Sequence, residues 1–142
     1  MKLACAIASG MLVCVGSVVA EDVPGGPLQE AGHPVIEFPT VAVALETLTH
    51  RAGAEVHSDQ GWTIVQENRG LTLWSFVPKD HPAYPAVVKR VMSQNGAGSW
   101  AVNMSVHCEA AKAACDQLVR DFDELNEQMR KDIEKRTGQN DL

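Results

Sequence analysis

Aromatic residues and clustered positive charge are scarce in this chain. Its 142 residues include three tryptophans, three phenylalanines and one tyrosine, and 12 basic side chains against 18 acidic ones give a net charge of −6. Binding to phosphate groups requires concentrated Lys and Arg. The acidic balance therefore excludes nucleic acid as the expected partner, and it argues equally against adhesion to anionic lipid.

Sequence motifs that mark an enzyme or a cofactor site are also missing. The chain has no Gly-x-Ser-x-Gly, no glycine-rich phosphate loop and no pair of carboxylates in an apolar setting. We therefore predict no catalytic residue and no cofactor, and a non-enzymatic protein is the favoured class.

One apolar run is long enough to cross a membrane, from Leu3 to Ala20. It is rich in Ser, Gly and Ala, ends in small residues and is followed by the acidic Glu21, which is typical of a secretory signal peptide. A membrane anchor is the alternative, because about 18 apolar residues can span a bilayer, but no basic flank follows the run. Residues 1–20 are therefore predicted to be a signal peptide, and the mature protein to be periplasmic or secreted without a membrane span.

Cleavage after residue 20 removes Lys2 and leaves 122 residues with 11 basic and 18 acidic side chains, a net charge of −7. This length suits one domain. Residues 21–38 are rich in Pro and Gly and lack periodic apolar positions, so we expect an extended leader. Residues 39–137 are expected to form a single α+β domain, and residues 138–142 a disordered tail.

Within this domain the periodicity of apolar residues predicts the order helix, strand, strand, helix, strand, long helix. The fold class is α+β, with a small sheet of three strands, or four if residues 56–58 add one, and helices packed on it. Because strand, helix, strand is a crossover, the last strand is predicted to run parallel to the second. The expected elements are a helix over 39–53, strands over 62–67 and 71–77, a short helix Ala86–Ser93, a strand Trp100–His107 and a long C-terminal helix Glu109–Arg136.

The strand over 100–107 alternates bulky apolar and polar residues, as a strand with one buried face does. Its inward positions are Trp100, Val102, Met104 and Val106. Its outward positions include Asn103, Ser105 and His107, which predict a partly open sheet face.

Cys108 and Cys115 are the two cysteines that remain after cleavage. Seven residues on one helix rise about 10.5 Å, too far for a disulfide. We therefore predict that Cys108 lies at the strand end and bonds back to Cys115 on the helix, as an oxidising compartment favours. The alternative is a metal-handling site built from His107, Cys108 and Cys115.

A further alternative is a small hydrolase that uses His107 on the open sheet face. Ser105 and His107 share that face, but Asn103 beside them is no carboxylate that could orient the imidazole.

Two surfaces are candidates for a ligand or partner. Trp62 and Trp74 border a proline-rich segment that contains His81 and Tyr84, and an aromatic rim beside a rigid loop is typical of a peptide or small-ligand groove.

Apolar residues recur at steps of three and four along the long helix and form one apolar stripe, of which Leu118 and Phe122 are predicted to lie on the sheet. The helix is longer than the sheet, so the later apolar residues Leu125, Met129 and Ile133 need cover from the rest of the chain or from a second molecule. Contact with a second copy would make a homodimer through this helix.

Taken together, these features predict a small exported protein of the cell envelope that binds a protein, peptide or small-ligand partner. Metal handling and hydrolysis remain the alternative functions.

The cleavage site is directly testable. Intact mass of the exported protein is expected to correspond to a chain that begins at Glu21, because small residues occupy the cleavage positions before it. A mass that includes Met1, or an acyl group on Cys14, would contradict the signal-peptide assignment.

Overall fold

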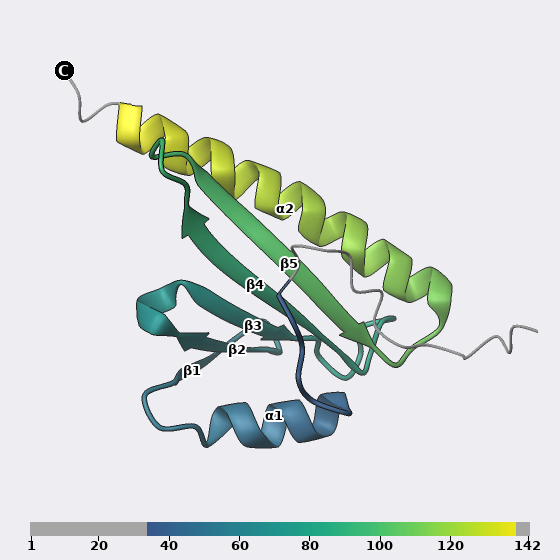
Figure 1. The fold of residues 1–142 in the computed structure, drawn as a ribbon. Helices are drawn as coiled ribbons and strands as arrows, with labels where there is room; N and C mark the ends of the chain where they lie inside the picture. The colour runs from purple at the N-terminus through teal and green to yellow at the C-terminus, as the bar shows by residue number, and fades with distance from the viewer. Residues whose placement is uncertain (1–33, 139–142) are drawn as a thin grey trace, which may run out of the picture.

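The computed structural model describes residues 34–138. The predicted signal peptide, most of the predicted leader and residues 139–142 lie outside the described residues. Within the described part, two helices and five strands form a mixed α+β domain with a long C-terminal helix (Figure 1). The elements are α1 (Val41–Thr49), β1 (Glu55–Asp59), β2 (Trp62–Glu67), the short 3-10 turn η1 (Asn68–Gly70), β3 (Thr72–Phe76), β4 (Ala86–Gln94), β5 (Trp100–Cys108) and α2 (Lys112–Gly138).

The five strands form one antiparallel sheet in the order β1-β2-β3-β4-β5, so each strand pairs with its neighbour in sequence. Gln60 and Gly61, both at positive φ (47° and 85°), make the two-residue turn between β1 and β2. Because the sheet has five strands, the prediction of three or four strands was wrong. The predicted parallel pairing was wrong too, because β5 pairs with β4 in an antiparallel register and does not pair with β3.

The segment predicted as the helix Ala86–Ser93 is strand β4. Its valines fall at spacings that match a helix as well as a strand, and Pro85 suggested a helix start. β4 is buried on both faces, Val87 in one core and Val88 in the other. A strand covered on both sides reads as a continuous apolar run rather than an alternating one, and β-branched residues favour it.

Helix α1 covers one face of the sheet with the apolar side of its short amphipathic sequence. Thr40 caps it by accepting a hydrogen bond from Val43 N at 3.2 Å. Phe38, just before the helix, meets the Trp74 ring edge-on with centroids 5.7 Å apart. The buried residues of this core are Val41, Ala44, Leu48, Val65, Trp74, Phe76 and Val87.

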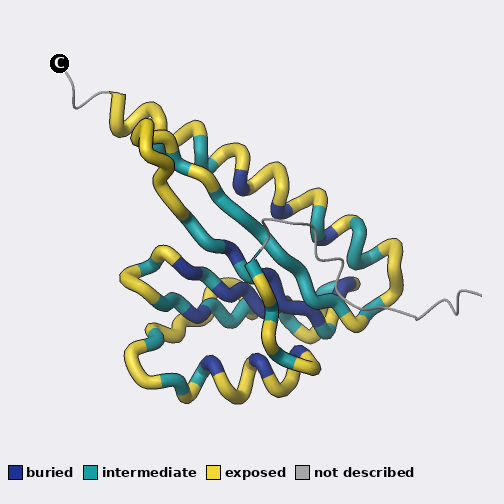
Figure 2. Tube along the Cα trace, in the orientation of Figure 1, coloured by how far each residue is buried: buried dark blue, intermediate teal, exposed yellow. Residues whose placement is uncertain are grey.

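Helix α2 covers the other face and runs antiparallel to β5 (Figure 1). As the apolar stripe predicts, Leu118 and Phe122 are buried against the sheet, where they join Val77, Ala83, Ala86 and Val88. The predicted disulfide is present, with an S–S distance of 2.07 Å between Cys108 at the end of β5 and Cys115 on α2. It fixes the start of α2 to the strand that α2 covers. Figure 2 shows buried positions on the sides of both helices that face the sheet.

Helix α2 begins at Lys112, whereas the sequence pattern predicted a start at Glu109. Glu109 instead connects the end of β5 to the first turn of α1. Its Oε1 accepts a hydrogen bond from Val41 N, in the first turn of α1, at 2.7 Å and lies 3.4 Å from His107 Nε2. A carboxylate at a helix N-terminus satisfies an unpaired amide and complements the helix dipole.

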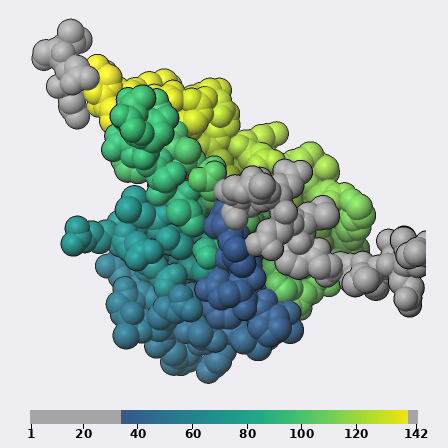
Figure 3. Space-filling view, viewed as in Figure 1, coloured from purple at the N-terminus to yellow at the C-terminus, as the bar shows by residue number. Residues whose placement is uncertain are grey.

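The β4–β5 hairpin reaches beyond the rest of the sheet. β3 pairs with β4 only as far as Val91, so no third strand of the described part lies beside the hairpin tip. In the space-filling view the tip and the C-terminal half of α2 stand out together from the body that holds α1 (Figure 3). Among residues 34–138, no helix combines the length and apolar character needed to cross a membrane.

Glu109 gives a stability prediction. We expect Glu109→Ala to lower the free energy of unfolding by about 1 kcal/mol, as loss of a helix-capping acceptor does, and Glu109→Gln, which keeps an acceptor oxygen, to cost less. Denaturant melts measure both. Glu124→Ala on α2 is the control, since Glu124 is exposed and makes no hydrogen bond or ion pair within the described residues. Equal losses for Glu109→Ala and Glu124→Ala would show that the contact with Val41 stabilises nothing.

Candidate functional site

The inward side of α2 is less apolar than its sequence pattern predicts. Leu125, expected in the apolar stripe, keeps 40% of its surface exposed, whereas Asn126 is buried with 9% exposed. Steps of four residues connect Leu118, Phe122 and Asn126, so the helix turns an amide toward the strand. Met129 and Ile133, predicted to need cover, are half-buried, and Met129 packs against the sheet through Arg90.

Polar groups and methionine sulfurs meet between α2 and the hairpin. Asn126 Nδ2 donates to Met104 Sδ at 3.4 Å, and Arg90 Nη1 donates to Met129 Sδ at 3.2 Å. The Arg90 guanidinium also stacks over Phe122, 5.1 Å from the ring centroid. Arg90 is only 7% exposed, and this burial lowers the pKa of its guanidinium.

Two buried side-chain atoms, Arg90 Nε and Asn126 Oδ1, have no hydrogen-bond partner among residues 34–138. Buried polar groups are nearly always paired, because leaving one unpaired costs about 1–3 kcal/mol. Such a group indicates either a local loss of stability or a place where an additional partner belongs.

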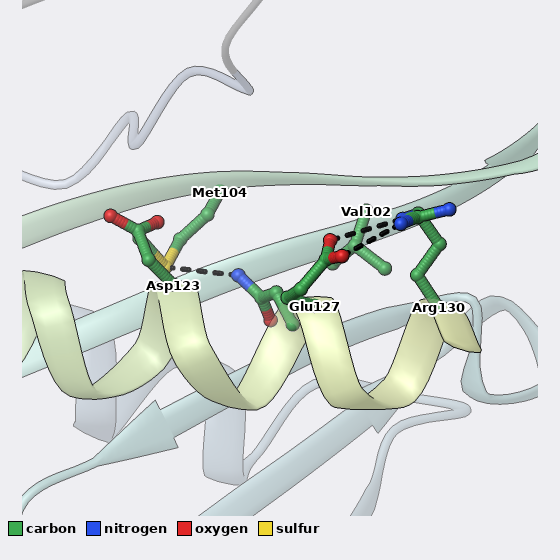
Figure 4. A pocket seen from close by; sticks show the side chains of 6 residues that line it. Val102, Met104, Asp123, Glu127 and Arg130 are labelled. Atoms are coloured by element: carbon green, nitrogen blue, oxygen red, sulfur yellow. Dashed lines mark hydrogen bonds and ion pairs between the residues drawn. The ribbon is translucent and has the colours of Figure 1, made fainter. Parts of the chain in front are cut away.

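Asn126 lines a pocket between β5 and α2, which we call the β5–α2 groove. Its volume is about 180 Å³, several times the ≈30 Å³ that a water molecule occupies in the liquid, so a side chain can enter it. Figure 4 shows Asp123, Glu127 and Arg130 of α2 turned toward Val102 and Met104 of β5. The lining residues are Val102, Met104, Asp123, Asn126, Glu127 and Arg130.

The charges of the groove are unevenly paired. Arg130 is held by Glu127 at 2.7 Å and by Glu134 at 2.6 Å. Its hydrogen bonds and positive charge lower the pKa of Glu127, and Glu127 in turn raises the pKa of Arg130. Asp123, by contrast, makes no ion pair or hydrogen bond with any residue between 34 and 138. The carboxylate of Asp123 on the groove wall therefore has no hydrogen-bond or ion-pair partner within the described part.

The outer edge of β5 lies beside this groove. Glu109 N donates to Pro85 O and Asn95 N donates to Ser99 O, each at 2.9 Å, on either side of the β4–β5 ladder. Hydrogen-bonded pairs recur at every second residue of an antiparallel ladder, so the odd-numbered residues of β5 bond to β4. The even-numbered ones point their N–H and C=O groups outward, where the described residues provide no strand. The even-numbered residues of β5 are Trp100, Val102, Met104, Val106 and Cys108.

The aromatic residues predicted to form a groove rim do not lie together. Trp62 packs between His81 and Phe122, with ring centroids 5.4 Å and 5.8 Å away. Trp74 is buried on the opposite face of the sheet, in the core that α1 covers. Tyr84 is exposed in the loop between β3 and β4. The structure therefore brings Trp62 and His81 together but keeps Trp74 away from both.

Asn103, Ser105 and His107 face the side of the sheet that carries α1, and all three are half-buried. His107 contacts Glu109, whose carboxylate also binds α1, and it makes no hydrogen bond with Ser105. The sulfurs of Cys108 and Cys115 are bonded to one another, so in this state neither is a thiolate ligand. No group of three or more potential metal ligands occurs among residues 34–138.

Sequence reasoning missed most of the groove. Periodicity along the long helix singles out only its apolar residues, and Asp123, Asn126, Glu127 and Arg130 are not among them. A signal was present in the spacing, because Asn126 continues the four-residue steps that begin at Leu118. Comparisons with protein-family models, curated proteins and solved structures find no match to this chain, so the groove has to be interpreted from its own geometry.

The buried guanidinium gives a prediction. Arg90 has no carboxylate partner among the described residues, and replacing a buried charge by an apolar side chain of similar length is often stabilising. We expect Arg90→Met to raise the free energy of unfolding by about 1–3 kcal/mol in denaturant melts.

Lys89→Met is the matched control on the other face of the same strand. Lys89 Nζ donates to Val35 O at 2.7 Å and stacks on Trp74, so its loss is expected to lower stability. Destabilisation by Arg90→Met as large as that by Lys89→Met would mean that the sulfur and ring contacts of Arg90 outweigh its desolvation.

Proposed function

We propose that this domain is a non-enzymatic binding module of the cell envelope, and that it takes up a protein or peptide partner in the β5–α2 groove. The observation that carries this proposal is the side-chain-sized pocket between β5 and α2, where the buried Asn126 leaves Oδ1 without a hydrogen bond to any of residues 34–138. Pockets beside a strand select the side chains of a segment that binds there.

The two edges of the sheet differ in a way that supports this assignment. β1, at one edge, is five residues long and carries Glu55 and Asp59, the short and charged form by which proteins protect an edge from pairing. β5, at the other edge, is nine residues long and contains no Lys, Arg, Asp, Glu or Pro. Such an edge is a ready template for another strand.

The groove lining suits binding better than chemistry. It consists of two apolar side chains, one amide, two carboxylates and a guanidinium that is already paired, and none of the lining residues is a Ser, Cys or His. The Cys108–Cys115 disulfide supports an oxidising compartment and therefore an envelope location.

A matched pair of substitutions tests the proposal. Val102→Lys puts a charge on the groove edge, and Val56→Lys puts the same charge on the exposed β1 edge. We expect wild-type protein and Val56→Lys to capture the same partner from the envelope fraction of the source cells, and Val102→Lys to capture at least about tenfold less.

Thermal melts of both variants establish that they are folded. Undiminished capture by folded Val102→Lys, or an equal loss in Val56→Lys, would show that the partner does not bind in the groove.

A further inference from the structure

We infer that the part of the sheet that α2 leaves uncovered is a docking surface for an amphipathic helix of another protein, with basic residues along both sides of its apolar face. This surface, the open face, consists of the α2-side positions of β1, β2 and β3 together with the flank of α2 beside them. It lies on the opposite side of α2 from the β5–α2 groove. It is therefore a second interface, which goes beyond the proposed function.

One helix is too narrow to cover five strands. Neighbouring strands lie about 4.8 Å apart, whereas a helix with its side chains is about 10 Å wide. α2 packs along β5, reaches β4 through Arg90 and touches β2 where Phe122 meets Trp62 (Figure 1). α1 lies on the opposite face, so no helix of the described part covers the rest of β1–β3 on the α2 side. The strip from β1 to β3 is about 10 Å wide, which is the width of one further helix.

The two faces of β2 and β3 differ in burial as this geometry requires. Val65 and Trp74, under α1, are 0% and 1% exposed. Their sequence neighbours Ile64 and Leu73 turn to the α2 side and are only half-buried. Large aliphatic side chains on a sheet are normally covered by another layer. The open face therefore has an apolar floor that lacks such a layer within residues 34–138.

Helical spacing adds Leu125 to this surface. Asn126 faces β5, and Met129 faces Arg90 of β4, which gives the direction in which the helix surface turns from β5 toward β3. At about 100° per residue, Leu125 lies about 40° beyond Met129 in the same direction. Its exposed side chain thus stands on the flank that borders β3, beside the apolar floor.

The rim of the open face is acidic on both sides. The β1 carboxylates lie on the α2 side because they are in register with the even-numbered residues of β2, and the α2 carboxylates share the flank of Leu125. None of the four forms an ion pair with any residue between 34 and 138. They are Glu55 and Asp59 on β1, and Asp121 and Asp132 on α2.

An apolar floor between two acidic borders is complementary to a helix with an apolar stripe and Lys or Arg on each side of it. Helices dock in such surfaces through apolar residues spaced three and four apart. The complementary charges then fix the orientation of the helix and exclude acidic competitors.

Other occupants fit less well. Residues 21–33 contain no Lys or Arg, and only four residues follow Gly138, so neither segment supplies a basic helix. A second copy of the chain carries the same acidic rim and a net charge of −6, so two open faces brought together repel one another. A basic helix from another protein meets both requirements.

Designed peptides test this on the whole mature protein. The probe is a peptide of about 18 residues, since shorter isolated helices are marginal in water. It has leucines at helical spacing, lysines on both sides of them and alanines elsewhere. One comparison peptide has glutamates in place of the lysines, and another has the same composition in scrambled order. By fluorescence anisotropy, we expect the lysine peptide to bind at least about tenfold more tightly than either.

Matched variants locate the bound peptide. The double variant Asp59→Asn/Asp132→Asn is expected to weaken binding of the lysine peptide at least about fivefold. Asp123→Asn/Glu124→Gln removes the same charge from other sides of α2, and we expect it to change binding less than about twofold.

A second pair of variants tests the apolar contact. Leu125→Asn is expected to weaken binding at least about fivefold, whereas Leu45→Asn, at a leucine of similar exposure on α1, is expected to leave it unchanged. Thermal melts establish that all variants are folded.

The outcomes separate this inference from the proposed function. Equal affinity for the lysine peptide and either comparison peptide, or equal effects of the two double variants, would overturn the inference. So would the absence of binding at millimolar concentration, or a dimer in sedimentation that Leu125→Asn dissociates. Folded Val102→Lys, which blocks the groove, is expected to bind the lysine peptide undiminished; a loss there would place the peptide in the groove and overturn the open face as its site. The proposed function is decided independently, by whether Val102→Lys loses its envelope partner.

Discussion

The rest of the structure depends on one constraint: the single sheet must be covered on both faces. Strand β4 shows this constraint most directly. Val87 and Val88 are neighbours in sequence, yet they are buried in different cores, one under α1 and the other under α2. The two helices come from opposite ends of the described chain, so both faces are covered only when both ends are in place. β4 therefore joins the two helix-on-sheet layers of the described part.

The two layers differ in chemistry. The hydrophobic cluster under α1 includes a buried tryptophan, and the half-buried polar residues Asn103, Ser105 and His107 of β5 lie on the same face. The layer under α2 changes along its length, from Leu118 and Phe122 near the disulfide to Asn126, Arg90 and two methionine sulfurs farther along. Thioethers are weak acceptors that adapt to irregular surroundings. Two other polar atoms of this layer, Asn126 Oδ1 and Arg90 Nε, have no hydrogen-bond partner among the described residues. The incompletely satisfied end of the layer is also the end where the groove opens.

The sequence predicted those features whose physics is local. The alternation along β5 and the stripe through Leu118 and Phe122 followed from periodicity, and the disulfide followed from the rise of a helix. β4 could not be told from a helix, because a strand buried on both faces loses the period of two that identifies strands. Because β4 was predicted as a helix, the predicted strand count was too low and β5 was predicted to run parallel to β3. The groove could not be predicted for another reason: which side of α2 lies next to the outer edge of β5 depends on tertiary packing, which no single segment encodes.

The contact of Glu109 with Val41 also bears on how the chain folds. It joins residues 68 positions apart, and through it Glu109, which follows β5, supplies an acceptor to the first turn of α1. During synthesis α1 is complete long before Glu109 exists, and a nine-residue helix is marginal by itself in water. Closing a loop of this length before any other contact forms is entropically costly and slow. The first turn of α1 can therefore complete its hydrogen bonding only once the end of β5 has reached it.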